Sequence, residues 1–120
     1  MSTRALIIVK DEYGDKLGFY RHSDGYPEGV MPLIQKYVDM VRSGQLRNNV
    51  VQSAGWLIEL GRQELVDMYK DMGESGVPAY YKWKIGTIEP HVITNPKKQS
   101  DLEYCYTINL SNCTVQAKEL

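Results

Sequence analysis

Side chains suited to charge and proton chemistry gather in one short stretch of the chain, residues 19–31. Arg21 can place two parallel hydrogen bonds on a phosphate or a carboxylate. His22, beside it, can donate, accept or exchange a proton near neutral pH. Asp24 can orient His22, bind a sugar hydroxyl or ligate a metal ion. Together these three side chains predict a site for a small anionic ligand.

Aromatic rings and backbone N–H groups belong to the same stretch. Tyr20 and Tyr26 can stack on a base or on another ring. Gly29 and Val30 lie where the sequence predicts the start of a helix, and N–H groups at such a start suit an anion. The stretch therefore predicts a pocket for a ligand with both a ring and an anionic group, such as a nucleotide.

Arg4 lies outside this stretch and is a further candidate for the anion site. It stands at the entrance of the first predicted strand, which should pair with the strand that ends near His22. Arg4 could then lie beside His22 or Asp24 and add a second cation to the anion site. The alternative is a simple salt bridge between Arg4 and Asp24.

Two other interpretations of the central stretch stay open. In a structural one, Arg21 pairs with Asp24 and His22 hydrogen-bonds the turn, as a corner between strand and helix often requires. In a catalytic one, a hydrolase or phosphodiesterase uses His22 as base or acid, Asp24 as its orienting partner and Arg21 for charge stabilisation. No Ser or Cys nucleophile stands in a known motif, so we expect a binder rather than an enzyme.

A further hypothesis needs no small ligand. The chain has nine Tyr and two Trp but one Phe, and tyrosine suits half-buried surfaces, pocket walls and interfaces. Exposed tyrosines and sheet edges could form a module that inhibits a host protein. The same features predict a homo-oligomer, through extension of the sheet or pairing of the helices.

Two places outside the central stretch could carry chemistry. His91 lies in the segment 90–100, which has the composition of a flap and could close over a ligand, although an exposed loop histidine is the simpler interpretation. Asp101 and Glu103 share one face of a predicted strand, as carboxylates that hold Mg²⁺ often do. No third carboxylate accompanies them in a recognisable motif, so we predict neither a metal site nor a cofactor.

Composition excludes several classes of protein. The 120 residues fit one domain, and a net charge of −1 argues against general nucleic-acid binding. No apolar run approaches the roughly 20 residues of a membrane span, and the N-terminus lacks the apolar segment of a signal peptide. We therefore expect a cytoplasmic protein that does not bind membranes. Cys105 and Cys113 are expected to be free thiols.

The positions of apolar residues predict an α+β fold with a mainly antiparallel sheet of about five strands and two helices packed on one face. Pro32 fits the first turn of the first helix, which should end near Ser43. The second helix should occupy residues 49–70, with Gly55 and Gly61 explained by close packing. The order is ββααβββ, with strands expected at residues 5–10, 16–22, 79–89, 102–110 and 113–117.

The central stretch also carries a resemblance. Ser2-Thr3-Arg4 before an apolar strand, then Tyr20-Arg21-His22-Ser23-Asp24-Gly25-Tyr26-Pro27-Glu28-Gly29, resembles a family of small hypothetical proteins from phages, prophages and other mobile elements. Asp101-Leu102-Glu103-Tyr104-Cys105-Tyr106 fits the same pattern. The resemblance implies a phage accessory role in the host cytoplasm, with counter-defence as one form of it, and implies no particular activity.

Overall fold

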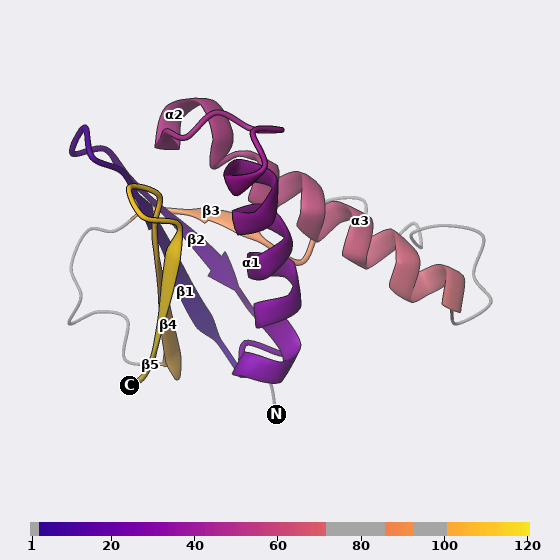
Figure 1. The fold of residues 1–120 in the computed structure, drawn as a ribbon. Coiled ribbons are helices and arrows are strands. Elements are labelled where there is room, and N and C mark those ends of the chain that lie inside the picture. Colours follow the sequence, from indigo (N-terminus) through magenta and orange to yellow (C-terminus); the bar gives the residue numbers. More distant parts are fainter. Residues whose placement is uncertain (1–2, 72–85, 93–100) are drawn as a thin grey trace.

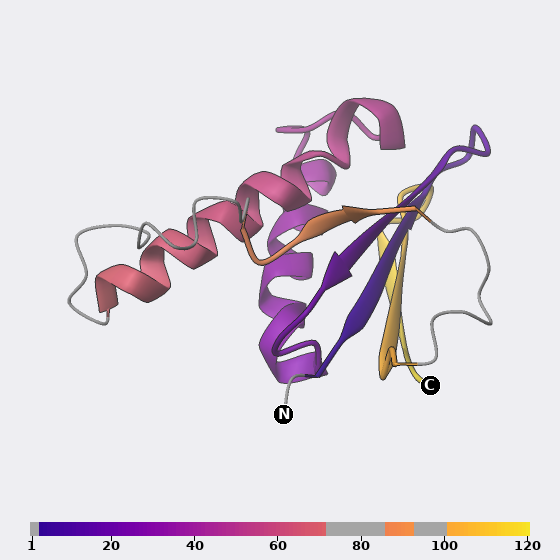
Figure 2. The ribbon, with the colours of Figure 1, turned by 180° about the vertical axis from the view of Figure 1, so that it is seen from behind.

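The computed structural model describes residues 3–71, 86–92 and 101–120. A five-stranded sheet with strand order β3-β2-β1-β4-β5 forms one layer, and the helices form the other, in front of the sheet in Figure 1 and behind it in Figure 2. The predicted α+β class and the order ββααβββ are confirmed in outline. The elements are β1 (Ala5–Lys10), β2 (Lys16–Arg21), α1 (Pro27–Arg42), α2 (Val50–Ser53), α3 (Trp56–Asp71), β3 (Glu89–His91), β4 (Tyr104–Asn109) and β5 (Thr114–Glu119).

The central strand is β1, because its sequence is apolar on both faces. It pairs antiparallel with β2 and parallel with β4. The parallel pair is the exception in a sheet that is otherwise antiparallel. Alternate residues of β1 (Ala5, Ile7 and Val9) face the helices and are fully buried.

The hairpin between β1 and β2 forms where the sequence predicts it. Gly14 adopts a φ of 87°, which favours glycine. The Asp11 carboxylate accepts hydrogen bonds from the backbone N–H groups of Tyr13 and Asp15 within the turn. It also accepts one from Val50 at the start of α2, at 2.8 Å. Asp11 therefore joins the hairpin turn to the helical layer.

Helix α1 starts earlier than the sequence predicts. Pro27, not Pro32, lies in its first turn, because the missing N–H of a proline costs nothing there. Pro32 lies inside the helix. An apolar stripe at helical spacing buries Val30, Leu33, Ile34, Tyr37, Val38 and Val41 against the sheet.

The single helix predicted over residues 49–70 is wrong, because the chain forms two helices there. α2 is one turn that starts at Asn49, whose side chain accepts a hydrogen bond from the Gln52 N–H at 2.8 Å. α3 begins at Trp56, after a turn at Ala54 and Gly55. Helical spacing of apolar residues continues across the turn, which is why the sequence did not reveal the break.

Close packing explains one of the two glycines of this region. A Cβ at Gly61 would lie 2.8 Å from the backbone nitrogen of Ile88, so the segment before β3 can approach α3 only at a glycine. Gly86 makes the reciprocal approach to Arg62. A Cβ at Gly55 would meet nothing within 4 Å. The prediction of close packing is therefore right for Gly61 and wrong for Gly55.

The C-terminal part of the sheet matches its predicted strands with shifted ends. β4 and β5 lie within or close to the predicted ranges 102–110 and 113–117. The strand predicted over 79–89 falls largely outside the described residues, and β3 is a short strand that overlaps its end. Both cysteines are free thiols. Within the described parts of the chain, no helix is long and apolar enough to cross a membrane.

Candidate functional site

The pleat of the sheet separates the predicted site residues onto two faces. In the register of β1 and β2, Ala5 lies opposite Arg21 and Leu6 lies opposite Tyr20. Since successive side chains alternate, Arg21 points toward the helices and Tyr20 toward the opposite face. No described helix covers this opposite face, and we call it the uncovered face. His22 follows Tyr20 onto the uncovered face. Arg21 and His22 therefore point to opposite faces of the sheet.

Arg21 is buried and links β2 to α3, so its charge is not open to a ligand. Its side chain is 4% exposed, and its Nη1 lies 2.8 Å from Oε1 of Glu64 on α3. Nε donates to the backbone oxygen of Ser23 at 2.9 Å, and Nη2 donates to that of Gly29 at 3.2 Å. A longer contact of 3.4 Å reaches Thr87. The partner of Arg21 is thus Glu64, not the Asp24 that the structural interpretation assigned to it.

The glycines of the central stretch serve close packing rather than anion binding. The N–H of Gly29 donates to the backbone oxygen of Tyr26 at 2.9 Å, and the N–H of Val30 donates to the same atom at 3.2 Å. A Cβ at Gly29 would collide with the backbone of Asp24. The positive φ of this loop falls on Asp24, at 56°. The N–H groups predicted for an anion are therefore already used within the chain.

Asp24 and His22 each take a tyrosine as partner, and these two contacts are separate. The Tyr26 hydroxyl donates to Oδ1 of Asp24 at 3.3 Å, and the Asp24 charge raises the pKa of Tyr26. The Tyr20 hydroxyl lies 2.8 Å from Nδ1 of His22. Asp24 is therefore not placed as the orienting partner of His22 that the catalytic interpretation requires.

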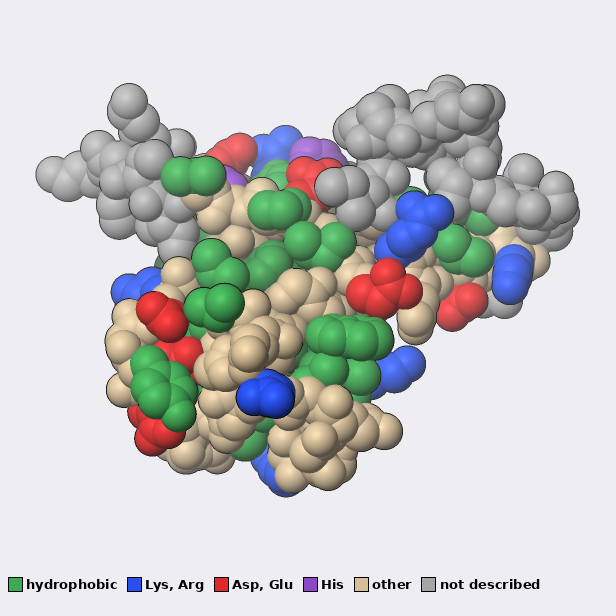
Figure 3. All heavy atoms as spheres, turned by 90° about the horizontal axis from the view of Figure 1, so that it is seen from above, with side chains coloured by type: hydrophobic (Ala, Val, Ile, Leu, Met, Phe, Trp, Pro, Cys, Tyr) green, Lys and Arg blue, Asp and Glu red, His purple; other side chains and the backbone are tan. Residues whose placement is uncertain are grey.

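Two histidine rings lie against Tyr20 on the uncovered face of the sheet, and Arg4 is close enough for its charge to act on Tyr20. The Tyr20 ring lies 5.9 Å from the His22 ring and 5.7 Å from the His91 ring, between centroids. Burial raises the pKa of the Tyr20 hydroxyl, and the charge of Arg4 opposes that rise. The view in Figure 3 shows histidines beside acidic and basic side chains along one edge of the molecule. We call Arg4, Tyr20, His22 and His91 the outer-face cluster.

Arg4 reaches this cluster from β1, as expected, but its acidic partner differs. Its Nη1 pairs with Oδ2 of Asp101 at 2.8 Å, so the alternative salt bridge with Asp24 is wrong. The Nε of Arg4 is buried and has no hydrogen-bond partner among the described residues. The Arg4 side chain as a whole is 35% exposed, so the outer part of its guanidinium can be reached by a ligand. In the described parts of the chain, no group of three or more His, Cys, Asp or Glu side chains could hold a metal ion.

A cavity of about 220 Å³ lies at the corner where β2, α3 and the segment before β3 meet. We call it the corner cavity. Its lining combines charged and polar groups with an apolar wall from α3: Arg21, His22, Ser23, Asp24, Glu64, Leu65, Met68, Tyr69, Thr87 and Glu89. His22 belongs both to this lining and to the outer-face cluster, so the two features are adjacent.

Comparison with known protein families, curated proteins and solved structures finds no match to this chain. The geometry of the corner must therefore carry the functional argument.

Sequence reasoning missed Glu64, Thr87 and Glu89 as lining residues. A signal for Glu64 did exist. It follows Leu57 and Leu60 at helical spacing, so it continues the buried stripe of α3 as a charged residue. A carboxylate on such a stripe requires a partner, because burial of an unpaired charge is costly. No comparable signal marks Thr87 or Glu89.

Proposed function

We propose that this protein is a non-enzymatic binder of a small nucleotide-like ligand held at the corner cavity. The observation that carries the proposal is the convergence of ionisable and polar side chains from β2, α3 and the segment before β3 on one hollow. Ligand sites commonly combine an apolar wall with a few polar groups that fix orientation. The corner cavity has this composition.

The charges of the cavity favour its use for the ring of the ligand rather than for the anion. Glu64 already pairs with Arg21, which leaves Asp24 and Glu89 as the further carboxylates of the lining. Carboxylates accept hydrogen bonds from N–H groups, which a base displays on its edge, and repel phosphate. Leu65 and Met68 would then cover the apolar face of the ring.

The anionic end of the ligand would lie at the outer-face cluster. His22 lines the cavity and also contacts Tyr20 on the uncovered face. Arg4 supplies a part-exposed cation there, whose pair with Asp101 lies at the surface. This arrangement replaces Arg21, which is buried, with Arg4 as the cation that meets the phosphate.

Binding is favoured over hydrolysis because of the partners of His22 and Asp24. A general base needs an orienting group and access to its proton, whereas each of these residues is hydrogen-bonded to a tyrosine. The resemblance to proteins of phages and mobile elements supports a role in which a nucleotide signal of the host is sequestered. Counter-defence in the host cytoplasm is the corresponding biological setting.

Protein interaction is the second candidate, and β5 favours it. β5 is an edge strand of six residues whose second edge pairs with no described strand. Unpaired edge groups can accept another strand. Antiparallel pairing of two β5 strands centred on Gln116 would place Val115 beside Ala117 of the second copy. We propose this as the route to a homo-oligomer.

The proposed function is tested first by native mass spectrometry of the freshly purified protein, compared with the same sample denatured. A non-covalent mass that is lost on denaturation would support a retained ligand, and the same spectrum gives the number of subunits. Thermal unfolding is then followed with each of the four nucleoside 5′-monophosphates, with nucleosides and with inorganic phosphate. We expect the nucleotides to raise the midpoint more than either part alone.

Variants separate the two ends of the site. Each of Arg4→Gln and His22→Gln should weaken nucleotide binding roughly 10- to 100-fold, the usual effect of losing one charge-assisted hydrogen bond. Arg47→Gln, which removes an exposed cation elsewhere, should leave affinity unchanged. Absence of both a retained mass and any nucleotide-induced shift would contradict the proposal. Turnover that His22→Gln abolishes would replace the binder with a hydrolase.

A further inference from the structure

The junction of α2 and α3 contains a glycine that the fold itself does not require. Gly14 and Gly44 adopt positive φ. At the other glycines with measured surroundings, a Cβ would lie within about 3 Å of neighbouring atoms: Gly25, Gly29, Gly61 and Gly86. Gly55 has neither property, since its Cβ would meet open space. Gly55 therefore leaves space at the surface of the junction that a side chain would fill.

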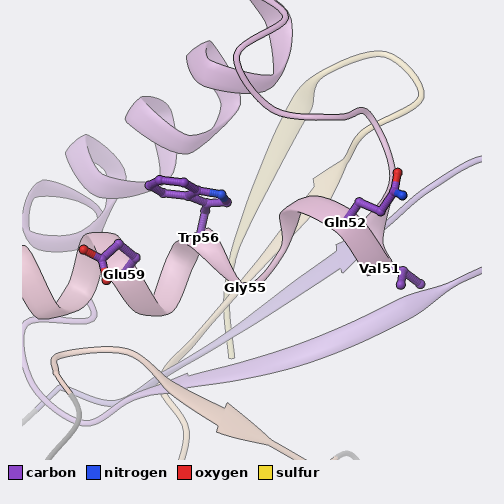
Figure 4. Close-up of a pocket in the computed structure, with 5 residues that line it drawn as sticks. All are labelled: Val51, Gln52, Gly55, Trp56 and Glu59. Atoms are coloured by element: carbon purple, nitrogen blue, oxygen red, sulfur yellow. The ribbon is translucent and has the colours of Figure 1, made fainter.

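The space above Gly55 is a hollow of about 440 Å³. Figure 4 shows Trp56 and Glu59 projecting from α3, and Val51 and Gln52 from α2, on either side of Gly55. We call these five residues the junction hollow. A larger side chain at Gly55 would occupy it, so the glycine keeps it open.

The walls of the junction hollow expose apolar surface that the fold leaves uncovered. Val51 is 75% exposed and Trp56 is 40% exposed, although both belong to residue types that are usually more buried. Among the described residues of the lining, Glu59 is the only charged one. An indole face, an apolar wall and a single carboxylate form a site complementary to a cation with an apolar stem.

We propose that the junction hollow binds an arginine side chain presented by a partner protein. A guanidinium can stack on the indole of Trp56 and direct two N–H groups to the Glu59 carboxylate, whereas an ammonium is more strongly hydrated and lacks the planar fork. The methylene stem of the arginine would cover Val51. Tryptophan and arginine are also the residues that most often dominate the energy of protein interfaces.

The hollow is independent of the corner cavity, because the two share no lining residue. Loss of nucleotide binding at the corner would therefore leave this inference intact. Conversely, a nucleotide-binding protein without an arginine site would overturn this inference and leave the corner proposal standing.

The test follows the indole N–H resonance of Trp56 by NMR in a Trp83→Phe background, which leaves one indole signal. The probe is the blocked pentapeptide Ala-Leu-Arg-Leu-Ala, compared with the same peptide carrying citrulline or lysine in place of arginine. We expect a saturable shift with arginine, and binding at least about fivefold weaker for the other two peptides, because citrulline lacks the charge and lysine lacks the planar fork.

Two variants and one control make the result specific. Gly55→Leu, which fills the hollow, and Glu59→Gln, which removes its charge, should each abolish the difference between arginine and citrulline. Glu12→Gln removes an exposed carboxylate from the β1–β2 turn and should change nothing. Gly55→Ala reports whether the junction tolerates substitution, since unchanged thermal stability shows that the fold is intact.

Three outcomes would overturn the proposal. Equal shifts with arginine and citrulline would show that the hollow binds both side chains by their shape, independently of charge. Saturation by arginine that Gly55→Leu and Glu59→Gln leave unchanged would place the peptide elsewhere. A shift that depends on protein concentration without any peptide would show that a second copy of the chain occupies the hollow.

Discussion

Replacement of Arg21 by methionine should destabilise the protein severely, although the two side chains are similar in length. The change removes the hydrogen bonds to Ser23 and Gly29 and the ion pair with Glu64. Removing one partner of a buried ion pair costs about 3–5 kcal/mol. The Glu64 side chain is 29% exposed and can regain some water, so we expect a loss of about 3 kcal/mol in the free energy of unfolding.

Urea unfolding followed by circular dichroism measures this loss. With a slope of roughly 1.5 kcal/mol per molar urea, the midpoint should fall by about 2 M. Arg42→Ala is the matched control, because the contacts of Arg42 are exposed: a hydrogen bond to the backbone oxygen of Cys113 at 3.0 Å and a long pair with Asp39 at 3.6 Å. An exposed pair of this kind contributes about 1 kcal/mol at most.

A double-mutant cycle locates the effect. Glu64→Gln keeps a side-chain acceptor for Arg21 and should cost less than Arg21→Met. The double variant should be more stable than the sum of the two losses predicts, because each single change already breaks the same contact. A loss below 1 kcal/mol for Arg21→Met, or full additivity, would refute the assignment of Arg21 as the junction of this corner.

Three further predictions concern substitutions at single positions. Burial raises the pKa of Tyr106 to about 12 from an ordinary value of 10.0, so its folded form holds the proton more tightly and stability should fall as pH rises from about 10 to 12; Tyr106→Phe should flatten that fall in urea unfolding. Gly61→Ala should lower the melting temperature because its Cβ would meet Ile88. Gly55→Ala should leave the melting temperature unchanged or raise it, with a gain of up to about 1 kcal/mol in the free energy of unfolding. Burial also raises the pKa of the Cys105 thiol, so in a Cys113→Ser variant its alkylation at pH 8 should be several-fold slower in the folded protein than in urea, and equal rates would contradict this.

Local patterns were enough to predict the hairpin, the apolar stripe of α1 and the α+β class. Alternation along β2 places Arg21 on the same side as Phe19, which is buried at 3% exposure. The sequence could not show that Glu64 lies on that side, because Arg21 and Glu64 are far apart in the chain and meet only when α3 packs on the sheet. Arg21 was therefore interpreted as a ligand residue when it is a partner of α3.

Other differences arise from contacts that periodicity does not record. The break between α2 and α3 leaves the apolar spacing intact, so it is visible only in the turn itself. The partners of Arg4 and His22 depend on which strand lies beside which, and Asp101 reaches Arg4 because β4 pairs with β1. The partners of individual residues therefore could not be predicted from periodicity alone.

The parallel pairing of β1 with β4 has a consequence for how the chain folds. β1 meets β2 through a short hairpin, but Ala5 meets Tyr104 only after nearly the whole chain has been made. Folding is slow because the entropy of closing so long a loop is lost before the contacts between β1 and β4 stabilise the chain. On the ribosome, β1 would leave the exit tunnel with one edge unpaired and would wait for the last strands, so this strand is where a nascent chain is most exposed to misassociation.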